Sequence, residues 1–128
     1  MKHALFDTDF NPVTPSSTQG FSTSRLSALG LDLVDASAEE TAATLLSRGR
    51  RRVFFMNAHC CNIRRKSRAY AAAVATADVL LPDGVGISLA ARMANEVPPP
   101  NLNSTDFVPL LLAEAAKAGK SVFLFGAR

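Results

Sequence analysis

Three apolar runs of the sequence are each followed directly by polar residues. Asn57-Ala58-His59 follows the first run, Asp83-Gly84 follows the second, and Gly126-Ala127-Arg128 follows the third. In an open parallel sheet, ligands bind beyond the carboxyl ends of the strands. If the apolar runs are strands of such a sheet, these three places are the first candidates for chemistry.

Asp83 is the strongest candidate for a catalytic side chain. It stands between Pro82 and Gly84, so we expect its carboxylate at the rim of the sheet, near a helix N-terminus and on a backbone that a ligand can approach closely. A carboxylate there can take the proton from a sugar hydroxyl as a general base. The competing interpretation of Asp83 is a turn or cap residue.

Asn57 and His59 are candidates for substrate binding. The amide of Asn57 can hydrogen-bond a sugar hydroxyl or amide, and His59 can bind a phosphate or move a proton. Each residue can equally be a loop or cap residue. For His59 the structural role is favoured, because no carboxylate partner stands near it in the sequence.

Cofactor and metal chemistry are poorly supported. Cys60 and Cys61 are adjacent and fit neither a zinc site nor a nucleophile motif, so we expect free thiols. Asp7-Thr8-Asp9 has the D-x-D pattern of some metal-dependent transferases, but no helix or strand is expected after it. Gly84-Val85-Gly86 lacks the third glycine of a dinucleotide fingerprint. We therefore expect no metal and no cofactor.

Strands and helices are predicted to alternate along most of the chain. Residues 1–24 lack any apolar period and are predicted to be a flexible leader. Beyond them we expect strands at 31–34, 53–56, 79–81 and 121–125. Helices are expected from the Ser37 capping box with Glu40 to Ser47, at 67–76, at 87–95, and from a Thr105 cap to Gly119, with Pro109 in the first turn.

This alternation predicts an α/β fold, specifically a Rossmann-like, mostly parallel sheet with helices on both faces. The strand at 53–56 is expected to be central, because its apolar run is continuous. Residues 25–128 are interpreted as one such domain, incomplete at its C-terminus, because the chain stops where this fold normally turns from strand into helix.

Composition places the protein among ordinary globular chains. It has 128 residues, 48% of them hydrophobic, and a net charge of +3. No apolar run reaches the roughly 18 residues of a membrane span, and no signal peptide is evident, so the expected compartment is the cytosol. Basic clusters at 48–52 and 64–68 can meet phosphates or anionic lipids, or can be solvated faces. Nucleic-acid binding is disfavoured, because no aromatic residues are interleaved with them.

Three linked motifs carry a family resemblance. Phe55-Met56-Asn57-Ala58-His59-Cys60, Leu81-Pro82-Asp83-Gly84-Val85-Gly86 and the segment from Asn101 to Pro109 resemble, in order and spacing, the signatures of the WecG/TagA/CpsF glycosyltransferases. The resemblance covers about residues 29–128. Three motifs together are far more specific than one.

The resemblance implies an inverting hexosyltransferase. It implies transfer of a sugar of the N-acetylmannosamine type from a UDP-sugar to a sugar on a polyprenyl diphosphate, in surface polysaccharide synthesis and without a D-x-D metal. It also implies contact of the full-length protein with the inner face of the plasma membrane. Asp83 matches the proposed base, and the substrate-binding candidates are Asn57, His59, Gly84, Asn103, Thr105 and Asp106. The alternative is a non-catalytic nucleotide-binding or interaction module, and the oligomeric state is left open.

The sequence departs from the family pattern at three positions. Phe55 stands where many members have Thr, Asn101 where some have Arg, and Ser104 where Gly is usual. A Cβ at position 104 costs about 1 kcal/mol or more if φ there is positive. Members also continue beyond the last predicted strand, so we expect the 128-residue chain alone to be inactive or nearly so; robust sugar transfer by it would contradict this expectation.

Overall fold

Two parallel strands form the centre of the structure, a computed structural model that describes residues 20–47 and 49–126. β3 (Val53–Met56) and β4 (Val79–Pro82) pair in register, with Val53 opposite Val79 and Met56 opposite Pro82. β4 is buried along its whole length, whereas β3 is buried only at Met56. No strand among the described residues pairs with the outer edge of β3. β3, predicted to be the central strand, is thus the less buried strand of the pair, and β4 is the more deeply buried one.

An antiparallel hairpin lies beside β4, on the side away from β3. Its strands are β1 (Thr23–Leu26) and β2 (Leu31–Val34). The predicted strand at 31–34 is confirmed, but β1 was not predicted, and Thr23 and Ser24 belong to it rather than to a leader. Residues 1–19 of the predicted leader lie outside the described residues, as does the Asp7-Thr8-Asp9 pattern.

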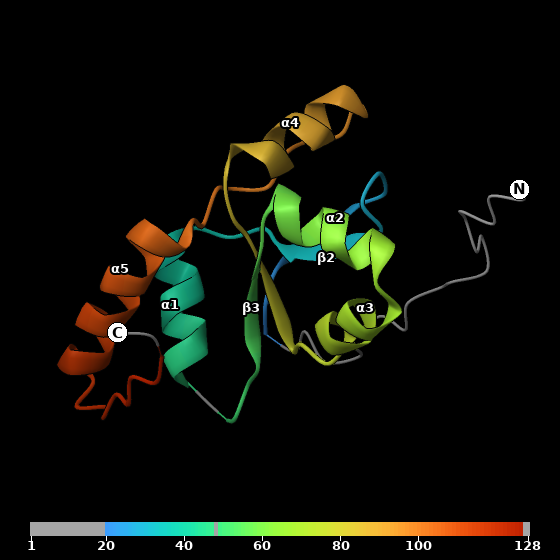
Figure 1. Ribbon diagram of the computed structural model, residues 1–128. Helices are drawn as coiled ribbons and strands as arrows, with labels where there is room; N and C mark the ends of the chain where they lie inside the picture. The colour runs from blue at the N-terminus through green and yellow to red at the C-terminus, as the bar shows by residue number, and fades with distance from the viewer. Residues whose placement is uncertain (1–19, 48, 127–128) are drawn as a thin grey trace, which may run out of the picture.

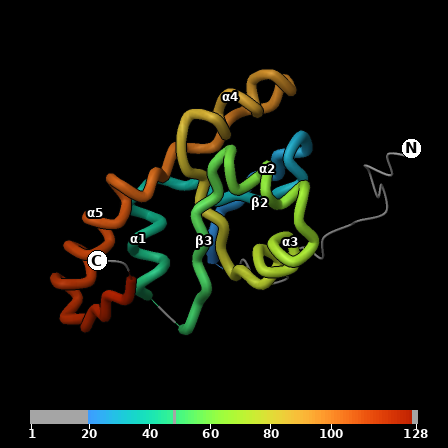
Figure 2. Tube along the Cα trace, in the orientation of Figure 1, coloured from blue at the N-terminus to red at the C-terminus, as the bar shows by residue number. Residues whose placement is uncertain are grey.

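Helices cover both faces of the strands, which confirms the α/β class. Figures 1 and 2 show α1 (Ala38–Ser47) and α5 (Ser104–Lys117) on one face, and α2 (Ala58–Lys66) and α3 (Arg68–Ala75) on the other. α4 (Val85–Met93) lies beyond the carboxyl ends of β3 and β4. Within the described ranges, no helix has both the length and the hydropathy of a membrane span.

Alternation along β3 and β4 divides the core into two layers. One face packs with α2, α3 and α4 through Phe54, Met56 and Leu80. The other face packs with α1 and α5 through Val53, Phe55, Val79 and Leu81. Because successive side chains of a strand point to opposite faces, these short apolar runs can supply both layers.

Local rules fix most helix starts. Ser37 and Glu40 form the predicted capping box, in which the Glu40 N–H donates to Ser37 Oγ at 3.2 Å and the Ser37 N–H donates to Glu40 Oε2 at 3.1 Å. The helix predicted at 67–76 is α3, with Ser67 and Thr76 as its caps. α4 begins at Val85, two residues before the predicted start. α2 was not predicted, because its sequence is polar and lacks an apolar stripe.

The end of α5 follows prediction, but the segment after it does not. Gly119 closes the helix at φ +66°, and the N–H of Lys120 donates to the carbonyl of Ala115 at 2.9 Å. Residues 121–125, predicted as a strand, form none, and Phe123 and Phe125 are 87% and 95% exposed. A strand needs a ladder partner, and no described strand pairs with this segment.

Candidate functional site

The ends of β3 and β4 bring two predicted site residues to the same edge of the sheet. Met56 and Pro82 are opposite each other in the register, so Asn57 and Asp83 follow at equivalent positions. The N–H of Asp83 donates to the carbonyl of Met56 at 2.9 Å, which extends the ladder by one residue. Asp83 and Asn57 are therefore neighbours at the carboxyl edge, where parallel sheets bind ligands.

Asp83 has a carboxylate that the described residues leave available. Its side chain is half-buried, and nothing in the described part of the chain donates a hydrogen bond to it. Asp83 is thus not a cap residue within these ranges. The turn that follows is made by Gly84, whose φ of +89° is a conformation that side chains other than glycine rarely adopt.

Asn57 is the N-cap of α2. Its Oδ1 accepts a hydrogen bond from the N–H of Cys60 at 2.8 Å, which satisfies one of the free donors of the first turn. The cap role that sequence left open is therefore the observed one, and it engages only the oxygen of the amide. The Nδ2 group can still donate to a ligand. His59 lies in the first turn of α2 with an exposed side chain.

Two helix N-termini meet beside Asp83. A Cβ added at Gly86, in the first turn of α4, would lie 2.7 Å from the Cβ of Ala58, the first residue of α2. The close approach explains why glycine occupies position 86, a role that the sequence reading did not foresee. Because helix N-termini carry free N–H groups and partial positive charge, this pair of ends favours negatively charged groups nearby.

The loop before α5 holds the turn after β4 in place. The N–H of Leu102 donates to the carbonyl of Pro82 at 2.9 Å, and Asn101 Oδ1 accepts from the N–H of Gly84 at the same distance. Asn101 is one of the three departures from the family pattern, and here it binds the backbone next to Asp83. The loop and the Asp83 turn are therefore one hydrogen-bonded unit.

Asn103, not Thr105, caps α5, so the predicted cap is wrong. Asn103 Oδ1 accepts from the N–H of Asp106 at 3.0 Å, and its Nδ2 donates to Asp106 Oδ2 at 2.8 Å. Thr105 is exposed on the first turn. The helix starts two residues earlier than expected, because the side-chain oxygen of Asn103 accepts from the third helical N–H. Pro109 consequently lies within the helix, beyond its first turn.

The other two departures also have local explanations. Ser104 is the first residue of α5 and does not have a positive φ, so its Cβ adds no backbone strain. Phe55 packs edge-to-face against Phe107 of α5, with ring centroids 6.2 Å apart. Phe55 therefore contributes to the α1 and α5 layer of the core.

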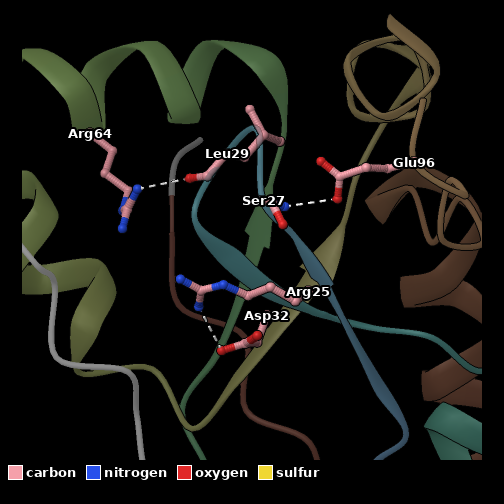
Figure 3. Close-up of polar contacts among 6 residues, drawn as sticks. All are labelled: Arg25, Ser27, Leu29, Asp32, Arg64 and Glu96. Atoms are coloured by element: carbon pink, nitrogen blue, oxygen red, sulfur yellow. Dashed lines mark hydrogen bonds and ion pairs between the residues drawn. The ribbon is translucent and has the colours of Figure 1, made fainter. Parts of the chain in front are cut away.

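Glu96 anchors the far end of α4 to the hairpin (Figure 3). Its two carboxylate oxygens accept from the N–H groups of Ser27 and Ala28 at 2.8 and 3.0 Å. Arg64 donates to the carbonyl of Leu29 at 3.2 Å in the same turn. Sequence analysis missed these contacts, which join residues up to 69 positions apart. They fix the helix whose N-terminus adjoins Asp83.

Cys61, near the candidate site, has a buried thiol. Cys60 and Cys61 are free, as predicted. Burial raises the pKa of the Cys61 thiol, the neighbouring Cys60 raises it further, and Arg64 partly opposes both. A raised pKa keeps the thiol protonated at neutral pH and makes it a poor nucleophile.

An open hollow lies elsewhere on the surface. It has a volume of about 410 Å³ and lies between the hairpin and α1. Its lining residues are Gly20, Phe21, Ser22, Asp35, Ala36, Glu40, Thr41 and Thr44. None of the predicted site residues lines it. The described residues contain no group of three His, Cys, Asp or Glu side chains that could hold a metal.

Comparison with known proteins identifies the family. Residues 26–128 match the sequence model of the glycosyl transferase WecG/TagA/CpsF family. The chain belongs to this family. Searches of curated proteins and of solved structures find no match. The match spans β2 to α5 and includes the Asp83 turn, the Asn57 cap and the loop at 101–103. The hydrogen-bonded edge described above therefore lies within the matched part of the chain.

Proposed function

We propose that the protein transfers a hexose or N-acetylhexosamine, of the N-acetylmannosamine type, from a UDP-sugar to a sugar on a polyprenyl diphosphate. The observation that carries this proposal is the position of Asp83. Its carboxylate lies at the carboxyl edge of the sheet, beside Asn57, without a hydrogen-bond donor among the described residues. A general base needs such a free acceptor near the nucleophile.

The proposed reaction is a single displacement with inversion. Asp83 takes the proton of an acceptor hydroxyl as its oxygen attacks the anomeric carbon. A new carbon–oxygen bond forms on one face of the sugar, and the bond to the UDP oxygen breaks on the other. The departing diphosphate takes the electron pair, and the N–H groups at the starts of α2 and α4 are suited to that charge.

The remaining candidate residues have supporting roles in the proposal. Asn57 donates from Nδ2 to a sugar hydroxyl or amide while its oxygen caps α2, and the exposed His59 binds phosphate. Gly84 allows the ligand to approach the backbone. Asn103, Thr105 and Asp106 shape the acceptor side of the pocket from the first turn of α5. The reaction takes place at the inner face of the plasma membrane, where a polyprenyl-linked acceptor is found.

Titration calorimetry tests the nucleotide part of the proposal. UDP and UDP-sugars are expected to bind, whereas ATP and NAD are not. Asn57→Asp places a negative charge beside the diphosphate and is expected to weaken UDP binding about tenfold or more. Asp35→Asn, at an exposed carboxylate after β2, is the matched control and leaves binding unchanged. Equal affinity for UDP and ATP would favour the general nucleotide-binding module over the transferase.

A further inference from the structure

One side of α4 carries an apolar stripe that the described part of the chain leaves exposed. Val85, Leu89 and Met93 are 80%, 59% and 77% exposed. They stand four residues apart, and each residue of a helix turns by about 100°, so the three side chains lie within an arc of about 80°. Ile87 and Ala91, the buried residues of the helix, lie on the opposite side. We call Val85, Leu89 and Met93 the α4 stripe.

The charge beside the stripe is positive. α4 contains one charged residue, Arg92, which is exposed and lies seven positions after Val85, on the same side of the helix. Glu96, the first acidic residue after the helix, accepts hydrogen bonds from N–H groups of the hairpin. An apolar helix face with a neighbouring arginine is suited to an anionic lipid surface, where a long basic side chain reaches the headgroups.

The stripe begins at the candidate site. Val85 is two residues after Asp83, and α4 lies beyond the carboxyl ends of β3 and β4, at one end of the molecule (Figure 1). A sugar on a polyprenyl diphosphate is presented at the surface of a bilayer, because the polyprenyl chain lies among the acyl chains. A membrane in contact with the α4 stripe therefore meets the same end of the molecule as that sugar.

The size of the stripe favours a membrane over a second copy of the chain. A stable interface between two proteins uses about 20–30 residues on each side. The stripe supplies three, and Val97, 85% exposed after the helix, adds a fourth. Every other exposed large apolar side chain among the described residues lies in the segment 122–125. Binding at the surface of a bilayer needs only a short apolar face with basic charge beside it.

We propose that the α4 stripe and Arg92 form a docking surface for a membrane that contains anionic phospholipids. The stripe enters the boundary between headgroups and acyl chains, and Arg92 pairs with headgroup phosphates. Docking holds Asp83 at the level where a lipid-linked sugar is presented. The proposal rests on the proposed function, which places the acceptor in the membrane. Lipid binding needs neither nucleotide nor acceptor, so its failure leaves the calorimetric and turnover tests of the proposed function unaffected.

A fluorescent reporter on the 128-residue chain tests which surface meets the lipid. The probe is a vesicle of phosphatidylglycerol and phosphatidylcholine in equal amounts, compared with a vesicle of phosphatidylcholine alone. The chain has no Trp, so Leu89→Trp supplies a single reporter. Its emission is expected to shift to shorter wavelength on the anionic vesicles and to be quenched by brominated acyl chains. Phe123→Trp, at the other end of the molecule (Figure 1), is the matched control and is expected to show neither change.

Charge substitutions separate the roles of the stripe and the arginine in a vesicle sedimentation assay. Leu89→Glu places a carboxylate in the apolar surface and is expected to weaken binding to the anionic vesicles about tenfold or more. Arg92→Gln is expected to weaken it about fivefold and to reduce the preference for phosphatidylglycerol. Phe123→Glu is the matched control and keeps the binding. Leu89, Arg92 and Phe123 are exposed, so the variants should fold, which circular dichroism checks.

Three results overturn the proposal. The first is an unsubstituted chain that does not bind the anionic vesicles. The second is binding that survives Leu89→Glu, or that Phe123→Glu weakens as much. The third is a dimer, seen by analytical ultracentrifugation without lipid, that Leu89→Glu dissociates, since a second copy would then cover the stripe.

Discussion

Replacing Gly86 by alanine tests whether α2 and α4 meet as closely as the structure shows. The new Cβ would lie 2.7 Å from the Cβ of Ala58, and neither atom can rotate away, because each is fixed to its backbone. Overpacking of this kind costs about 1–3 kcal/mol, and alanine recovers up to about 1 kcal/mol of helix propensity. We therefore expect Gly86→Ala to lower the free energy of unfolding by about 1–2 kcal/mol.

A second substitution isolates the contact. Ala58→Gly removes the opposing Cβ and alone costs about 0.5–1 kcal/mol. In that background the alanine at position 86 no longer meets Ala58, so its effect changes sign and it stabilises by a few tenths of a kcal/mol. Urea unfolding of the four chains, followed by circular dichroism, gives the coupling free energy. An equal loss from Gly86→Ala in both backgrounds, or no loss in either, would refute the contact.

Three further predictions concern the supports of the site. Glu96→Gln removes the charge from the double hydrogen bond to Ser27 and Ala28, so the free energy of unfolding should fall by about 1 kcal/mol. The control Glu39→Gln, on the exposed first turn of α1, should change the free energy of unfolding little. Equal effects of the two substitutions would contradict the role of Glu96 as an anchor. Gly84→Ala forces a side chain into a φ of +89° and should cost about 1 kcal/mol or more, which thermal unfolding measures. Burial raises the pKa of the Cys61 thiol in the folded state. The contribution of Cys61 to stability is therefore complete below the pKa of the unfolded thiol and is lost as pH rises through the folded pKa. The free energy of unfolding should fall above about pH 8.5, and Cys61→Ala should remove that fall.

Local signals were sufficient for much of the fold. The capping box of Ser37 and Glu40 depends on residues three positions apart, so the sequence displays it directly. The alanine-rich composition of 67–76 is likewise a local signal for α3. The apolar runs at β3 and β4 likewise predict strands from a few adjacent residues. α2 escaped prediction because its residues are mostly polar, although a cap role for Asn57 had been considered. β1 escaped for the same reason.

Long-range contacts could not be predicted in this way. The rule that ligands bind at the carboxyl ends of parallel strands was enough to place Asn57 and Asp83 at one edge. It could not supply Asn101, which binds Gly84 across 17 positions, or Glu96, which binds the hairpin. The order of strands in a sheet is also a tertiary property. The sequence therefore could not show that β4, rather than β3, is the more deeply buried strand.

Turnover by the Asp83→Asn variant of the full-length protein tests the central claim most directly. Asparagine keeps the size of the side chain but cannot take a proton, so kcat should fall about 10²–10⁴-fold while the donor Kd, measured by calorimetry, stays the same. The Asp35→Asn control should keep full activity. A kcat for Asp83→Asn within about threefold of the unsubstituted enzyme, well short of the loss expected of a missing general base, would contradict the assignment of Asp83 as the base.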